Sequence, residues 1–173
     1  MRDSTKRITY GAATAALSVV LLFLAQLLQV GSAGFLFLAA LVPVPVLLLG
    51  WRGTAAVASL ASCVLSLLLL PDKLLALPYV CFLAWYAILH SLTFRFRPVA
   101  RYALHLAAFD VGVALWYGAV SLFLGIDPLS LFGLAGFSWV VAVGVAGLQI
   151  VFLAVDWLFG MCESYIASRM KRF

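Results

Sequence analysis

Two aspartates and two histidines are the residues whose chemistry stands out in this sequence, because they lie in or beside long apolar segments. Asp110 and Asp156 lie inside such segments, while His90 and His105 flank a basic loop. An ionisable side chain at membrane depth is costly, so each one needs a partner or a function. We expect the carboxylates to form an ion-pair layer with nearby cations. The arginines proposed for this layer are Arg95, Arg97 and Arg101, with His105 beside them.

Other chemistry is less well supported by the residue patterns. A coupling or proton-handling site would also use buried carboxylates. An intramembrane aspartyl protease needs two of them, but Asp110 follows Ala-Ala-Phe and Asp156 follows Leu-Ala-Val, whereas that class uses Gly-x-Gly-Asp. The sequence contains no Ser-His-Asp grouping, Walker A loop or Cys/His ligand cluster. We therefore predict no enzyme activity, no metal site and no other cofactor.

A second group of polar residues is uncharged and lies mostly toward the opposite ends of the apolar segments. Amides and aromatic rings that point into a helical bundle provide orienting hydrogen bonds and flat surfaces for an uncharged or zwitterionic organic ligand. The alternatives are an interfacial belt for the rings and helix–helix hydrogen bonds for the amides. The predicted ligand-binding residues are Gln26, Gln29, Tyr79, Trp116, Tyr117, Trp139 and Gln149.

Six apolar segments position these residues. The chain of 173 residues is 66% hydrophobic and only 10% charged, which leaves too little polar surface for a soluble globule. None of the segments alternates as a strand would, and about 20 helical residues cross a bilayer core. We predict an all-α integral membrane protein with one domain over residues 1–173. Its six transmembrane helices are expected at 8–30, 35–50, 54–70, 75–92, 102–124 and 137–160.

The basic residues orient this bundle. Ten of the eleven Lys and Arg residues lie before the first segment or after the second, fourth and sixth, and Lys73 is the exception. Because Lys and Arg beside a span are retained in the cytoplasm, both termini are predicted to be cytoplasmic, in a multi-pass protein of the cell membrane. The net charge of +5 is explained by these loops, so no nucleic-acid partner is predicted.

Two local patterns add detail within the segments. Pro43 and Pro45 fall in the middle of the second segment and predict a kink or an unwound turn, because proline lacks an amide donor. Ala12 and Ala16 form a small-xxx-small step at the start of the first segment. This step would serve either close packing inside the bundle or docking to a partner protein.

Three stretches carry a resemblance to a known family: RITYGAATAA at 7–16, LVPVP at 41–45 and GWRGTAA at 50–56. They resemble the substrate-binding S components of energy-coupling factor transporters, and most closely their YybS-type relatives. The resemblance covers the first three segments, and the last three are similar in number, length and topology.

The resemblance implies a six-helix subunit that binds a small, vitamin-like organic solute toward the outer face of the membrane. Ala12 and Ala16 would then dock onto a transmembrane coupling subunit driven by two cytoplasmic ATPases. The alternative is a non-transport scaffold or regulatory protein, of MreD-like or YybS-like type, that acts by recruiting partners. The Gly-rich span ending in Asp that is typical of MreD-type proteins is not found here.

Overall fold

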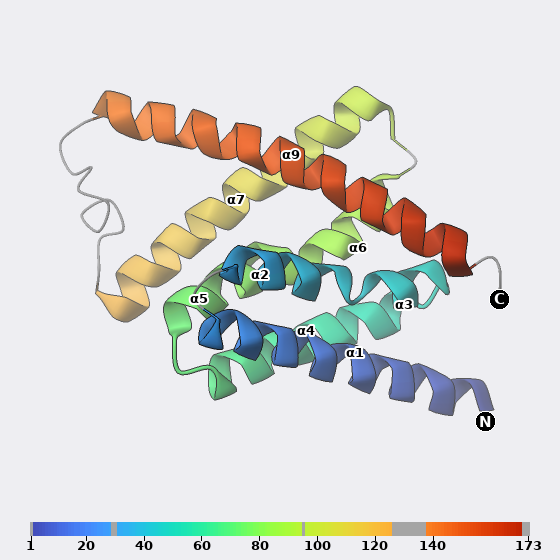
Figure 1. Cartoon of the computed structure of the whole chain (residues 1–173). Coiled ribbons are helices and arrows are strands. Elements are labelled where there is room, and N and C mark those ends of the chain that lie inside the picture. Colours follow the sequence, from blue (N-terminus) through green and yellow to red (C-terminus); the bar gives the residue numbers. More distant parts are fainter. Residues whose placement is uncertain (1, 29–30, 95, 126–137, 171–173) are drawn as a thin grey trace.

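The computed structural model describes residues 2–28, 31–94, 96–125 and 138–170, and all regular structure within these ranges is helical (Figure 1). The all-α prediction is therefore confirmed for this part of the chain. The elements are α1 (Arg2–Leu27), α2 (Ser32–Leu41), α3 (Val44–Leu48), α4 (Arg52–Leu69), α5 (Lys73–Pro78), the π-helical turn η1 (Tyr79–Leu83), α6 (Ala84–Thr93), α7 (Pro98–Leu124) and α9 (Ser138–Met170).

Five helical stretches within the described residues are long and apolar enough to cross a membrane. They are Asp3–Leu27, Arg52–Leu69, Lys73–Thr93, Pro98–Phe123 and Val143–Met170. The predicted span at 35–50 corresponds instead to a shorter apolar stretch, Ser32–Leu48, made of α2 and α3. The chain is thus compatible with a multi-pass membrane protein, with five full-length helices and one shorter, interrupted element.

The interruption between α2 and α3 lies at Pro43, as predicted. α2 ends at Leu41 and α3 begins at Val44. The carbonyl of Pro43 still accepts a hydrogen bond from the amide of Leu47, at 3.1 Å, so the break costs few backbone bonds. Gly50, with a φ of 80°, then turns the chain into α4.

The first half of the chain packs more closely than the second. α1 contacts α2 and α4 extensively, and the buried residues of α4 are all small: Ala55, Ala58, Ser59, Ser62, Cys63 and Ser66. Small residues let helix backbones approach each other, so close packing inside the bundle explains why these buried positions of α4 are small. Of the most apolar stretch of each helix, 39% is buried in α1, but only 11% is buried in α7 and 17% in α9. α7 and α9, which cross each other in Figure 1, therefore depend on few contacts.

One of these contacts is a close approach between α7 and η1. A Cβ added to Gly112 would lie 2.8 Å from the Cβ of Phe82, a distance that real Cβ atoms do not adopt. A Cβ added to Gly118, on the same helix, would meet nothing within 4 Å.

We predict that Gly112→Ala lowers the free energy of unfolding by about 1–3 kcal/mol, because α7 has to move away from Phe82. Gly118→Ala is the matched control. It should leave stability unchanged or raise it slightly, since alanine favours helix over glycine. Thermal unfolding of both variants in one detergent measures the difference, and equal unfolding temperatures would show that α7 does not pack against η1 as described.

Candidate functional site

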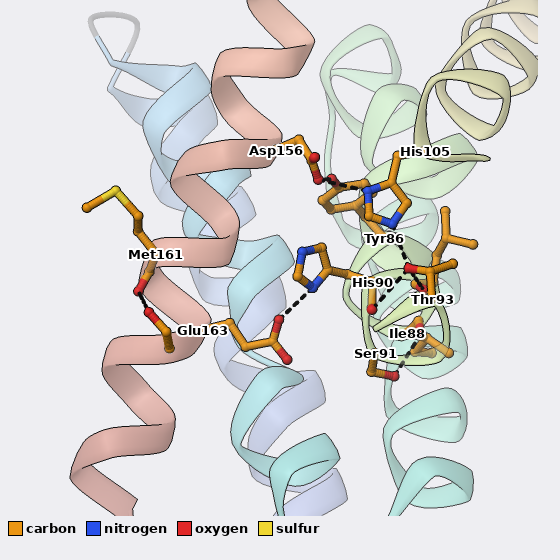
Figure 2. A network of polar contacts seen from close by, with 11 residues as sticks. Tyr86, Ile88, His90, Ser91, Thr93, His105, Asp156, Met161 and Glu163 are labelled. Atoms are coloured by element: carbon orange, nitrogen blue, oxygen red, sulfur yellow. Dashed lines mark hydrogen bonds and ion pairs between the residues drawn. The ribbon is translucent and has the colours of Figure 1, made fainter. Parts of the chain in front are cut away.

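The carboxylate of Asp156 lies at the centre of a buried polar network (Figure 2). The hydroxyl of Tyr86 donates a hydrogen bond to Oδ1 of Asp156, and Nδ1 of His105 lies 2.9 Å from the same oxygen. On the other side of the ring, Nε2 of His105 is 2.7 Å from Oγ1 of Thr93. Asp156 is only 2% exposed and His105 is fully buried, so protein groups replace water around both.

The hydrogen bonds of this network fix the orientation of the His105 ring. A carboxylate only accepts, so Nδ1 of His105 donates to Asp156. At the other nitrogen, Nε2 contacts Oγ1 of Thr93, and this hydroxyl also lies 3.0 and 3.1 Å from the backbone carbonyl oxygens of Leu89 and His90.

A second acid–base pair lies one step along the same helices. Nδ1 of His90 is 2.5 Å from Oε2 of Glu163, and the His90 and His105 rings lie 5.3 Å apart between centroids. Figure 2 shows both carboxylates on α9 facing histidines on α6 and α7.

Helix periodicity explains why these side chains converge. On α6, Tyr86, His90 and Thr93 are four and three residues apart and so share one face. Asp156 and Glu163 are seven residues apart, two turns, on one face of α9. This spacing was the sequence signal available for Tyr86 and Glu163, which were not among the predicted site residues.

A polar cavity of about 800 Å³ adjoins the network. Its wall comes from the α3–α4 region, α6, the start of α7 and the second half of α9. Its charged and titratable lining residues are Arg52, His90, Arg101, Tyr102, Asp156 and Glu163.

An apolar cavity of about 640 Å³ lies on the other side of Tyr86, between α2, η1, α6, α7 and α9. Among its aromatic walls, the rings of Phe109 and Phe152 stack with centroids 4.3 Å apart. Trp116 also lines this cavity, and its Nε1 is buried with no hydrogen-bond partner among the described residues. The cavity surface is thus almost entirely aromatic and aliphatic.

The predicted ligand-binding residues do not converge on one site. Of those whose side chains the structure describes, Trp116 alone lines either of these two cavities. The Tyr79 hydroxyl is buried against Ser62, with 2.9 Å between the oxygens, and Tyr117 is 39% exposed. Oε1 of Gln26 is buried without a partner in the described part of the chain. Gln29 and the side chain of Trp139 lie outside the described residues.

Within the described residues, neither aspartate pairs with the arginines that we expected. Asp110 is exposed, and its oxygens accept from Nε2 of Gln149 at 3.3 and 3.4 Å. Within the described residues, the ion pairs of carboxylates are with histidines. Arg101 precedes His105 by one turn of α7 and stays at the cavity wall, while His105 reaches Asp156. Arg97 is exposed, and Arg95 lies outside the described residues.

Comparisons with known proteins returned no match to this chain among family models, curated proteins or solved structures. The geometry of the cavities and the resemblance noted in the sequence are therefore the grounds for a function.

We predict that Asp156→Asn lowers the free energy of unfolding by about 1–3 kcal/mol, because a neutral amide oxygen accepts from Tyr86 and His105 more weakly than a carboxylate does, and the amide adds a buried donor with no partner. Asp110→Asn is the control for the same chemical change at an exposed position and should change stability by less than about 0.5 kcal/mol. Thermal unfolding of the two variants side by side tests this. A stable Asp156→Asn, or an equal loss in both, would contradict the network's structural role.

Proposed function

We propose that this chain is a membrane subunit that binds a small organic solute in the apolar cavity and presents it for uptake by an energy-coupling factor transporter. The observation that carries the proposal is the cavity itself. Its volume of about 640 Å³ falls within the range of about 300–1,000 Å³ that is usual for small-molecule sites. Aromatic walls with one orienting donor suit a solute with a flat, largely apolar ring system.

The lining groups narrow the class of solute. The hydroxyl of Tyr86 is occupied by Asp156, so Tyr86 offers the cavity its ring alone. Nε1 of Trp116 has no partner among the described residues, and we propose that it pairs with a carbonyl or ring-nitrogen acceptor of the solute. No charged side chain of the described residues lines this cavity, which argues for an uncharged solute.

The proposed topology places the cavity toward the outer face. We propose that α2 and α3 together make the sixth passage of the membrane and that both termini are cytoplasmic, as the distribution of basic residues predicts. In this topology, the α2 residues that line the cavity precede the Pro43 break and lie in the outer half. The polar network and its cavity then lie toward the cytoplasm.

The surface of α1 supports docking to a coupling subunit. Ala12 and Ala16 are exposed, whereas Thr14, Ala15 and Ser18 face the bundle and are buried. The small-xxx-small step is therefore free for a second helix to approach, as the S-component resemblance implies. Cytoplasmic ATPases would supply the energy through that coupling subunit.

We predict that Val113→Phe prevents solute binding, because Val113 lines the cavity and a phenyl ring would occupy it. Val111→Phe is the control on the same helix, since Val111 is 59% exposed and does not line the cavity. Untargeted mass spectrometry of protein purified in lipid nanodiscs measures the outcome. A small molecule should be enriched with the native chain and with Val111→Phe, and depleted at least tenfold with Val113→Phe. Equal recovery from all three would refute binding in this cavity.

A second prediction addresses the partner. The double variant Ala12→Leu/Ala16→Leu should lose co-purification with a co-expressed coupling subunit, because two leucines hold the helices apart. Ala103→Leu/Ala107→Leu, the same pair of enlargements four residues apart at exposed sites on α7, is the control and should retain the partner. Retention by the double variant would overturn the docking assignment. A chain without solute that still retains membrane partners would favour the scaffold alternative.

A further inference from the structure

We propose that the polar cavity is a binding site for a phosphate group, held by Arg52 and Arg101. The site is distinct from the apolar cavity and does not depend on the solute-binding function. The proposal follows from two arginines at the cavity wall that no described carboxylate pairs with, and from an unused donor on Arg101.

The acidic residues of the wall are already paired. Asp156 is 2.9 Å from His105, and Glu163 is 2.5 Å from His90. The arginines have no such partner, because within the described residues no carboxylate is paired with Arg52 or Arg101. Each acid at the wall thus contacts a histidine, and the two guanidinium groups are left without a carboxylate partner among the described residues.

Arg101 also has an unsatisfied hydrogen-bond donor. Its Nε is buried and has no partner in the described part of the chain. A buried donor without a partner destabilises the protein, and a ligand oxygen that reaches it would remove that penalty. The guanidinium lies over the ring of Tyr102, 5.2 Å from its centroid, and this contact restrains it at the wall.

The chemistry of guanidinium groups identifies the ligand. Arginine presents a planar set of donors that matches the oxygens of phosphate and binds them in pairs. The serine hydroxyls of the wall contribute little selectivity, because Ser91 and Ser164 donate to backbone carbonyls of their own helices, at 2.8 Å each. The arginines therefore determine what binds.

The size of the cavity leaves the source of the phosphate to experiment. A volume of about 800 Å³ exceeds what one phosphate group fills, so the site has room for the rest of a lipid headgroup or of a phosphorylated soluble molecule. The two sources share one recognition chemistry and differ in whether acyl chains accompany the phosphate.

The experiment uses the full chain in a maltoside detergent without phosphate. One arm adds inorganic phosphate at constant ionic strength, and the other adds phosphatidylglycerol, with a galactosyl diacylglycerol as the lipid control without phosphate. Native mass spectrometry measures bound lipid, and thermal unfolding measures stabilisation by either ligand. Arg101→Gln and Arg52→Gln are compared with the native chain and with Arg97→Gln, which removes the same charge from an exposed position that does not line the cavity.

The expected result is binding to the native chain and to Arg97→Gln, with affinity at least about tenfold lower in Arg101→Gln, the loss of one charged hydrogen bond. Arg101→Lys should bind with intermediate affinity, since it keeps the charge without the paired donors. If Arg101→Gln fails to fold, Arg52→Gln decides, because Arg52 is exposed and its loss should leave the fold intact.

Response to phosphatidylglycerol alone would identify a lipid headgroup, and response to inorganic phosphate would identify a soluble ligand. The proposal is overturned by three results: neither ligand binds, the galactolipid binds as well as phosphatidylglycerol, or Arg97→Gln weakens binding as much as Arg101→Gln does.

Discussion

The buried carboxylate of Asp156 is the constraint on which the second half of the structure depends. Neither lipid nor bulk water solvates a carboxylate inside a helical bundle, so its partners have to come from neighbouring helices. α6 supplies Tyr86 and α7 supplies His105. Because α7 and α9 bury little of their apolar surface, these bonds do much to set the rotation of both helices about their axes.

The rotation of α9 in turn determines which of its side chains line the cavities. Phe152 and Phe159 lie one turn before and one turn after Asp156, so they face the same neighbours. Both pack edge-on against Tyr86, with centroids 5.8 and 5.0 Å away. The ring of Tyr86 lines the apolar cavity, and its hydroxyl bonds to Asp156, which lines the polar cavity. The Tyr86–Asp156 hydrogen bond thus links a residue of each cavity wall.

The sequence predicted the positions of the helices better than it predicted which helices contact each other. Apolar runs and the Pro43 break follow from local chemistry, and the long helices overlap the predicted segments, although α1 begins at Arg2 rather than at 8 and α9 continues to Met170 rather than ending at 160. Pairing depends on which helix faces contact each other, and no local pattern reports that. Asp110 and Gln149 were therefore assigned to different groups although they bond to each other, while Asp156 was matched with arginines rather than with Tyr86. The second predicted segment does not form one full-length helix, because a proline breaks it into two short helices.

The π-helical turn η1 shows most clearly why spacing alone misplaced the candidate site. In an uninterrupted α-helix, residues seven apart differ by only about 20° around the axis, so Tyr79 and Tyr86 would share a face. Here the hydroxyl of Tyr79 bonds to Ser62 on α4, and that of Tyr86 bonds to Asp156 on α9. η1 begins at Tyr79 and ends at Leu83, before Tyr86, and its wider i→i+5 turn rotates the residues that follow relative to those before it. Tyr79, a predicted ligand residue, therefore lies in the core, while Tyr86, after the turn, lines the apolar cavity and bonds to Asp156.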